Sequence, residues 1–298
     1  YNYLKENANR VKCYIISHAH DDQMGALPYI YRKVPAPIYC SKLTAELIKS
    51  KTLIYGLKPI DYDFHIVENG PTIINNREFV FINMTHSVPG TLSVAIDTDE
   101  GYIFYASDFI IDFGAPSTNQ MDFKLLTTLS LKKKILILLS ESCDADKPGH
   151  ASPNHRITQH IQREFLESKG RIFISVYSQN LYNLREIIEL AIKANKKIIF
   201  LTDEVEKLFS HELLESMYSI PASNRASISE INRLREQDVL VLIDGCGEDV
   251  FQSIISFTNG ELVNNLTFNE NDTFIIACPG VAGTEKISIE AIDNAYKT

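Results

Sequence analysis

The strongest constraint on the fold is a regular alternation of apolar strands and amphipathic helices from about residue 150 onward. Four short apolar runs predict strands, at residues 171–176, 197–201, 239–243 and 273–277. Three amphipathic segments precede or separate them and predict helices, at residues 154–168, 181–194 and 204–218. Strands that alternate with helices of this length are typical of a parallel, Rossmann-like sheet. The sequence therefore predicts an α/β fold for the second half of the chain.

The first half of the chain mixes strands and helices less regularly. Its apolar runs predict strands at residues 11–16, 38–40, 79–84, 93–97 and 102–105. Helices are expected at residues 25–32 and after residue 41, where either Ser41 or Thr44 is a suitable cap. We expect the last two strands to pair as a hairpin. Residues 135–139 are wholly apolar, which predicts a strand in a sheet covered on both faces.

Length, charge and cysteine usage limit the class of protein. At roughly 150 residues per domain, the 298 residues predict two domains. The net charge of −9 argues against binding nucleic acid through bulk charge, so a nucleic-acid site would have to be a local basic groove. Five scattered cysteines without a CxxC pair indicate a reducing cytoplasm. With no apolar run near the ~20 residues of a membrane span, we predict a cytoplasmic protein without a membrane partner.

Three predicted strand ends carry residue types that bind metals. The segment His18-Ala19-His20-Asp21-Asp22-Gln23 follows the first strand, His86 follows residues 79–84, and Asp108 follows residues 102–105. Imidazole and carboxylate are the ligands that suit zinc or manganese. A lone HxH pair is more often two solvated histidines, and a lone His or Asp at a strand end is usually a turn residue. Three such strand ends in one chain favour a metal site.

This order of HxHxD, then His, then Asp resembles the metallo-β-lactamase superfamily, and the flanking residues are similar to the bacterial ribonuclease J family. Residues 18–30 resemble the family's HxHxDxxGGLPYLL segment, residues 85–89 its THSIP loop, and residues 107–112 its GDFKxD turn. Weaker matches follow. They resemble the family's DSTN segment at residues 141–144, its FASN segment at 177–180 and its PGNE segment at 282–285. The resemblance covers essentially the whole chain.

The resemblance implies a fold and a division into domains. Residues 1–150 would form part of a metallo-β-lactamase αββα sandwich, without its first hairpins. Residues 151–285 would form the inserted, Rossmann-like parallel α/β domain that this family calls β-CASP. Residues 286–298 would begin the return to the metallo-β-lactamase domain. The family also has a late loop, rich in His, Ser and Gly, that supplies the last metal ligand and holds the RNA phosphate. These 298 residues lack a match to that loop and to the first hairpins, and in this they resemble an excised fragment or a truncated paralogue.

The resemblance also implies the roles of individual residues. One metal ion would be held by His18, His20 and His86, and Asp108 would bridge to a second ion that Asp22 also binds. Asp22 would be the carboxylate nearest to the role of catalytic general base. RNA or phosphate contacts are implied for four further residues, Glu141, Ser142, Ser178 and Asn180.

Departures from the family pattern predict a weakened site. Gln23 replaces the family's second-metal histidine, and a neutral amide is a much poorer ligand. We expect one zinc or manganese ion, an impaired second site, and a weakly active RNA-processing and RNA-decay hydrolase with exo- or endoribonuclease activity. This resembles the second ribonuclease J of low-GC Gram-positive bacteria, and implies a homo-oligomer or a hetero-oligomer with a ribonuclease J paralogue.

Two other functions stay open. The first is a non-catalytic, RNA-binding subunit that stabilises an active ribonuclease J partner. The second is a small-molecule hydrolase, against which the long βαβα insertion argues. Four basic residues either line an RNA groove or lie on an ordinary solvated surface, namely Arg156, Arg163, Lys169 and Arg171. The three histidines spaced by five, His150, His155 and His160, are interpreted as surface residues.

Overall fold

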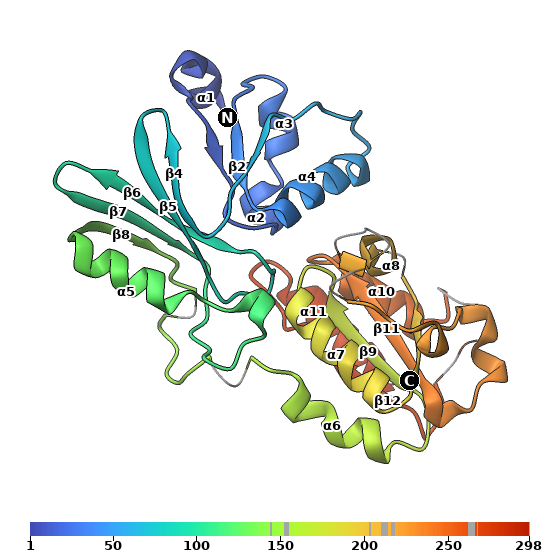
Figure 1. Cartoon of the computed structure of the whole chain (residues 1–298). Helices are drawn as coiled ribbons and strands as arrows, with labels where there is room; N and C mark the ends of the chain where they lie inside the picture. Colours follow the sequence, from blue (N-terminus) through green and yellow to red (C-terminus); the bar gives the residue numbers. More distant parts are fainter. Residues whose placement is uncertain are drawn as a thin grey trace. The chain divides into compact units, whose positions relative to one another are not determined.

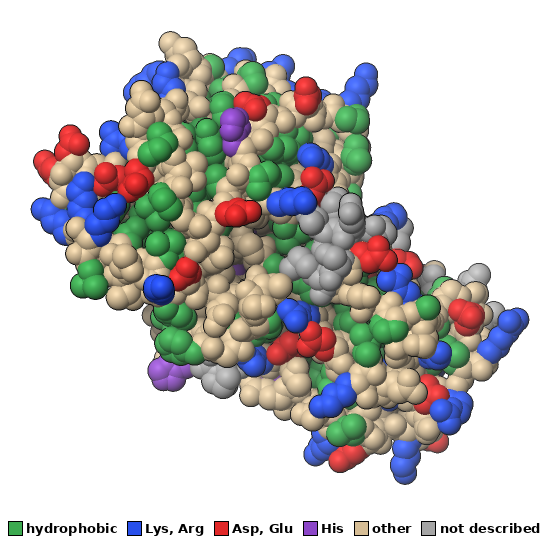
Figure 2. Space-filling model, in the orientation of Figure 1, with side chains coloured by type: hydrophobic (Ala, Val, Ile, Leu, Met, Phe, Trp, Pro, Cys, Tyr) green, Lys and Arg blue, Asp and Glu red, His purple; other side chains and the backbone are tan. Residues whose placement is uncertain are grey.

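The computed structural model describes residues 1–143, 145–151, 155–202, 204–209, 214–215, 218–261, 266 and 268–297. The chain divides into two compact units, Tyr1–Pro153 and Asn154–Thr298. Figure 1 traces both units, and Figure 2 shows their side chains coloured by type. Among the helices that the structure describes, none combines the length and the apolar character needed to cross a membrane.

The first unit begins with a short helix, α1 (Asn2–Glu6), and a small parallel sheet. The three strands of this sheet lie side by side in the order β1 (Tyr14–Ile15), β2 (Ile38–Cys40) and β3 (Phe64–Ile66). Three helices connect them, α2 (Asp21–Met24), α3 (Leu27–Tyr31) and α4 (Lys42–Ile54). Of the two predicted caps, Ser41 caps α4, because its Oγ accepts a hydrogen bond from the Thr44 backbone N at 3.3 Å.

A five-stranded sheet completes the core of this unit. Its strands follow chain order, β4 (Gly70–Ile74), β5 (Arg77–Asn83), β6 (Leu92–Thr98), β7 (Gly101–Ser107) and β8 (Ile135–Ser140). The predicted hairpin is confirmed, because β6 and β7 pair antiparallel from Val94–Tyr105 to Thr98–Gly101. β8 then pairs parallel with β7, after the connecting helix α5 (Phe123–Lys132).

The layers of the first unit run helix, sheet, sheet, helix. On one face of the large sheet, Tyr102 and Phe104 pack with Leu129 of α5. On the other face, Phe81 packs with Ile15 and Tyr39 of the small sheet. The neighbours of Tyr39 along β2 point to the opposite side of the small sheet and are fully buried, so the connecting helices cover that side.

Strand β8 corrects one expectation. Its five apolar residues, 135–139, are between 39% and 60% exposed, although their composition predicted cover on both faces. β8 is the edge of the sheet, and among the described residues it pairs with β7 alone. An apolar composition favours burial of a strand, but the strand is buried only where another segment of the protein covers it.

The second unit contains the parallel sheet that the sequence predicted. Its four strands, in the order in which they pair, are β10 (Lys197–Phe200), β11 (Val239–Gly245), β9 (Ile172–Tyr177) and β12 (Thr273–Ile276), and all pairs are parallel. The α-helices of this unit include α6 (Thr158–Glu167), α7 (Leu181–Lys193), α8 (Glu204–Phe209), α10 (Asp249–Thr258) and α11 (Glu285–Lys297). The predicted helix start at residue 154, and parts of the predicted helix at 204–218, lie outside the described residues.

Helices cover both faces of this sheet (Figure 1). Val241 and Ile243 of β11 pack with Phe251 of α10 and Ala291 of α11. Leu242 between them points to the opposite face and is equally buried, and on that face α7 contacts β10 and α6. α11 therefore packs inside the second unit.

Candidate metal centre

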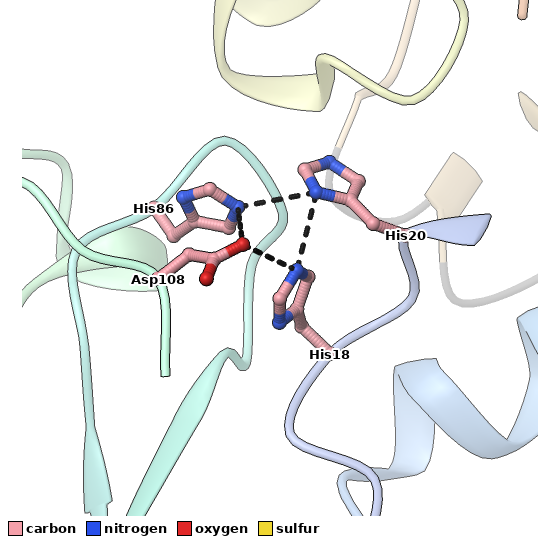
Figure 3. A group of neighbouring side chains, drawn as sticks. All are labelled: His18, His20, His86 and Asp108. Atoms are coloured by element: carbon pink, nitrogen blue, oxygen red, sulfur yellow. Dashed lines mark hydrogen bonds and ion pairs between the residues drawn. The ribbon is translucent and has the colours of Figure 1, made fainter. Parts of the chain in front are cut away.

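Loops at the ends of three strands bring four side chains together in the first unit (Figure 3). His18 and His20 lie between β1 and α2, His86 follows β5, and Asp108 follows β7. One possible ligand atom from each residue lies within 4.8 Å of the others. The strand-end residues that the sequence singled out thus meet at one point, apart from Asp22.

Most of the measured distances within this cluster are close to those around a single ion. His20 Nδ1 lies 3.1 Å from His18 Nε2 and 3.3 Å from His86 Nε2. Asp108 Oδ2 lies 3.4 Å from His18 Nε2 and 4.0 Å from His86 Nε2. A tetrahedral ion with bonds of about 2.1 Å holds its ligand atoms about 3.4 Å apart. Three of these four distances lie close to that value, and the four side chains form a group that could hold one metal ion.

The electrostatics of the cluster also suit a cation. Burial, assisted by repulsion from the neighbouring imidazoles, lowers the pKa of His18 to about 3 and that of His86 to about 2. Both rings are therefore neutral at neutral pH and keep a lone pair for a metal. Burial and the nearby carboxylates of Asp22 and Glu141 raise the pKa of Asp108. A divalent ion would relieve this crowding of negative charge.

Serine hydroxyl groups orient the imidazole rings. Ser17 Oγ lies 3.0 Å and Ser107 Oγ 3.4 Å from His18 Nδ1, which leaves Nε2 facing the cluster. Ser87 Oγ lies 3.1 Å from His20 Nε2, so Nδ1 faces inward. Partners of this kind fix the ring that binds the metal. Sequence reasoning missed all three serines, although each is the immediate neighbour of a predicted ligand.

Two backbone features direct the ligands inward. Ser107 has a φ of 61°, a left-handed conformation that few residues other than glycine adopt, and this turns the chain just before Asp108. Asn119 Nδ2 donates to the His86 backbone O at 2.8 Å and thereby fixes the loop that carries His86. A non-glycine residue held at positive φ is typical of functional sites.

Asp21, which lies between His20 and Asp22, anchors the metal-binding segment to α4. Lys51 Nζ lies 3.0 Å from Asp21 Oδ2, and the Tyr55 hydroxyl donates to Asp21 Oδ1 at 3.4 Å. Lys51 is only 8% exposed, so this carboxylate offsets part of the cost of burying its charge. The anchor fixes the start of α2. The sequence did not reveal it, because its members lie on different helices.

Asp22 and Gln23 lie beside the cluster rather than in it. Asp22 is exposed, and Gln23 Nε2 donates to its Oδ2 at 3.3 Å. Gln23 Oε1 accepts from the Tyr105 hydroxyl at 3.3 Å and from Ser17 Oγ at 3.4 Å. The carbonyl oxygen of an amide is its metal-binding atom, and in Gln23 this oxygen is directed into the protein.

The residues predicted to contact RNA or phosphate divide between the units. Glu141 and Ser142 follow β8 and are exposed, and Asp144 of the same motif lies outside the described residues. Ser178 is buried, with its Oγ 3.0 Å from Cys246 Sγ. Asn180 caps α7, where its Oδ1 accepts from a backbone N. The RNA contacts of these residues stay predictions.

Two of the basic residues considered for an RNA groove have structural partners. Arg171 forms a buried ion pair with Asp272, which ties the start of β9 to the turn before β12. Arg163 is exposed on α6, beside Glu164 and Glu167. Both arginines therefore have carboxylate partners within the second unit.

Comparison with known proteins identifies relatives of both units. Residues 169–295 match the family model described as ribonuclease J, beta-CASP domain. "Ribonuclease J 2" of Staphylococcus aureus is 27% identical over 293 residues, which covers 90% of this chain and 52% of that protein. "Ribonuclease J 2" of Staphylococcus epidermidis is 25% identical over 295 residues, covering 99% and 53%. The chain spans about half the length of these relatives.

A solved structure supports the fold. The crystal structure of a protein of unknown function from Enterococcus faecalis matches with a TM-score of 0.59, over 95% of this chain and 72% of that one. Its 14% identity shows a shared fold alone. The predicted α/β class with a parallel β-CASP domain is confirmed. The resemblance read from the strand-end motifs is confirmed as well, since this chain is similar to ribonuclease J along most of its length and matches that family's beta-CASP domain over residues 169–295.

Proposed function

We propose that this chain is a metal-dependent, RNA-processing hydrolase of the ribonuclease J type with low activity. The observation that carries the proposal is the convergence of His18, His20, His86 and Asp108 within 4.8 Å. The similarity to proteins named ribonuclease J 2 supports RNA as the substrate and phosphodiester hydrolysis as the reaction.

Each residue of the cluster has a role in this proposal. His18 Nε2, His20 Nδ1, His86 Nε2 and Asp108 would hold zinc or manganese, which supplies Lewis-acid chemistry and lowers the pKa of water. Asp22 is close enough to Asp108 to raise the pKa of that carboxyl. Exposed and held by Gln23, Asp22 is the group that we assign as general base.

The low activity follows from Gln23. Its carbonyl oxygen is engaged by Tyr105 and Ser17, so a second ion beside Asp22 and Asp108 would lack this ligand. Loss of one ion in a two-metal hydrolase removes several kcal/mol of transition-state stabilisation, and each 1.36 kcal/mol is about tenfold in rate. We therefore expect turnover roughly 10³-fold below that of a two-metal relative.

The proposal also covers the cellular location of the protein and its partners. The free cysteines fit a reducing cytoplasm. RNA is the expected partner, with Glu141, Ser142, Ser178 and Asn180 as the proposed phosphate contacts. A second copy or a ribonuclease J paralogue is the expected protein partner.

A non-catalytic, RNA-binding subunit is the second candidate, and the hydrogen bonds of Gln23 favour it. A small-molecule hydrolase is less favoured, because residues 169–295 match a ribonuclease domain. The deciding experiment follows the decay of 5′-monophosphorylated single-stranded RNA in manganese. Slow decay that His86→Ala abolishes would support the hydrolase. RNA binding without decay, in both the parent chain and Gln23→His, would establish the non-catalytic subunit.

A further inference from the structure

A short stretch of the first unit carries a charge opposite to that of the whole chain. Residues 23–60 contain six basic residues and a single carboxylate, that of Glu46, although the net charge of the chain is −9. The stretch includes α3, β2 and α4, so its charges belong to one part of the fold. Its basic residues are Arg32, Lys33, Lys42, Lys49, Lys51 and Lys58. A local excess of positive charge is the electrostatic requirement of a nucleic-acid site.

Three of these basic residues lie together at the end of α3. Arg32 and Lys33 extend its last turn, because the Lys33 backbone N donates to a carbonyl three residues earlier at 2.9 Å. Arg32 Nη2 donates to the Lys58 backbone O at 2.9 Å, which places Lys58 beside them. All three residues are exposed. Lys49 and Lys51, by contrast, form ion pairs with carboxylates.

The end of α4 brings Lys58 back to α3. Gly56 has a φ of 67°, in the left-handed region that favours glycine, and the Leu57 backbone N donates to the Thr52 backbone O at 3.2 Å. A turn of this kind ends a helix and reverses the chain. α3 and α4 lie side by side, and the residues that follow each helix reach the same surface (Figure 1).

Two tyrosines lie at this surface. Tyr29 of α3 and Tyr55, which follows α4, have ring centroids 5.9 Å apart and ring planes inclined at 32°. Two contacts hold the Tyr55 ring, since its hydroxyl donates to Asp21 Oδ1 at 3.4 Å and Lys51 Nζ lies 5.3 Å from its centroid. Tyr29 is 51% exposed, so part of its ring is open to solvent.

The tyrosines and the cations share one side of α3. Arg32 and Lys33 follow Tyr29 by three and four residues, the spacing at which helical side chains are neighbours. Aromatic rings stack on the bases of single-stranded nucleic acid, while nearby cations contact its phosphates. Five residues, Tyr29, Arg32, Lys33, Tyr55 and Lys58, form this tyrosine surface, which offers both kinds of contact.

The tyrosine surface adjoins the candidate metal centre. Asp21, which accepts a hydrogen bond from Tyr55, is the direct chain neighbour of His20 and Asp22. A single strand with one phosphodiester at the metal centre can therefore extend onto the tyrosines, and its neighbouring phosphates then meet the local positive charge.

We propose that the tyrosine surface binds unpaired bases of an RNA strand whose scissile phosphodiester lies at the metal centre. One base stacks on Tyr29, and Arg32, Lys33 and Lys58 contact the adjoining phosphates. The inference rests on the proposed function for RNA as the nucleic acid, and it adds a preference for single strands. Paired bases stack on one another in a duplex and offer no ring face to a tyrosine.

Fluorescence anisotropy of a labelled single-stranded RNA of about ten nucleotides tests the site in the 298-residue chain. A metal chelator is present, so that the measurement reports binding without hydrolysis. Tyr29→Leu keeps the apolar bulk but removes the ring, and should weaken binding at least fivefold. Tyr29→Phe keeps the ring and should bind like the parent chain. Tyr3→Leu changes an exposed tyrosine of α1 and should have no effect.

The lysines test the electrostatic part of the surface. Lys33→Gln combined with Lys58→Gln should weaken binding and reduce its dependence on salt concentration, because fewer counterions are released. Lys42→Gln combined with Lys124→Gln removes the same charge at exposed positions outside the surface and should change neither property. Equal effects of the two double variants would overturn the proposal, because net charge alone would then explain the binding.

A lipid surface is the alternative ligand for tyrosines beside cations. Leu53 and Ile54 precede Tyr55 and are 58% and 59% exposed, and apolar side chains near basic ones can insert into an anionic membrane. We expect Leu53→Ser combined with Ile54→Ser to leave RNA binding intact, and the parent chain not to sediment with phosphatidylglycerol vesicles. Sedimentation with these vesicles in place of RNA binding would overturn the proposal.

Decay of RNA in manganese distinguishes failure of this site from failure of the proposed hydrolase. RNA binding that requires the Tyr29 ring, without any decay, would support the tyrosine surface and contradict the hydrolase. Binding and decay that Tyr29→Leu leaves unchanged would overturn the surface and leave the hydrolase standing. Absence of binding to single-stranded RNA, or equal binding of a duplex of the same length, would also overturn the surface.

Discussion

The side-chain amide of Gln23 donates to Asp22 Oδ2 at 3.3 Å, and its carbonyl oxygen accepts from Tyr105 and Ser17. A hydrogen-bond donor thus stands next to a carboxylate at the position where the resemblance predicts a second metal ligand. This arrangement stabilises Asp22 without a cation. In the proposed function, Gln23 is therefore one cause of the impaired second metal site.

Replacing Gln23 with histidine tests that conclusion. Gln23→His should raise the number of tightly bound manganese ions per chain and increase RNA decay by tenfold or more, because a second ion adds Lewis-acid stabilisation. Metal analysis and decay of 5′-monophosphorylated RNA measure the two effects. Gln23→Glu serves as a comparison, since it restores charge without an imidazole. A rise in metal content without any rise in decay would argue for the non-catalytic subunit.

The four-residue cluster predicts a graded loss of metal affinity. His86→Ala and Asp108→Asn each remove a ligand and should weaken zinc binding at least 100-fold. Ser87→Ala removes only the hydroxyl that orients His20 and should cost roughly 10-fold. Competition with a chromophoric chelator measures all three. His65→Ala alters an exposed histidine outside the cluster, and equal losses in that variant would contradict the assignment.

The neutral histidines predict a loss of stability in acid. The pKa values of His18 and His86 in the folded chain lie far below the ordinary value of 6.5, so below that pH the unfolded chain binds protons that the folded chain does not. The free energy of unfolding should therefore fall as the pH drops from 6.5 toward 3, by at most about 1.4 kcal/mol per pH unit for each histidine.

Urea denaturation of the metal-free chain at several pH values measures this slope. His18→Asn should reduce the slope between pH 6 and pH 4, whereas His65→Asn should not. A slope that both variants share with the parent would show that other groups cause the acid sensitivity.

The anchor between Asp21 and Lys51 predicts an asymmetry between two substitutions. Asp21→Asn leaves the buried ammonium of Lys51 without its carboxylate and should cost about 3 kcal/mol of stability. Lys51→Met leaves only a half-exposed carboxylate and should cost about 1 kcal/mol. Thermal or urea unfolding compares the two, and a double variant that is no worse than Asp21→Asn would confirm that the residues act as a pair. Equal costs for the single variants would contradict it.

The exposed edge strand predicts a solubility effect. β8 presents five apolar residues and, among the residues that the structure describes, pairs with β7 alone; such edges favour association between chains. Leu138→Lys should raise the soluble, monomeric fraction of the 298-residue chain in light scattering. Leu131→Lys, on the exposed side of α5, is the matched control and should have a smaller effect. No difference between the two would show that the edge of β8 does not drive association.

The sequence alone determined the features that depend on neighbouring residues in the chain, such as strands, helices and the residues at strand ends. The apolar periodicity of residues 171–201 predicted β9, α7 and β10 to within a residue or two at each end. The strand-end positions of His18, His20, His86 and Asp108 predicted their convergence, because loops at one edge of packed sheets lie together. The spacing of the HxHxD segment also predicted that His18 and His20 lie on the same side of the chain.

Only the tertiary structure decided the features that depend on distant partners. The Asp21–Lys51 ion pair, the hydroxyl groups around His18 and the direction of the Gln23 amide join residues from separate elements, and no local pattern encodes such pairs. The exposure of β8 shows the same limit, since an apolar run predicts burial only if another segment covers it. The contact between Tyr29 and Tyr55 likewise arises from the packing of α3 against α4 and from the turn at Gly56, which periodicity does not specify.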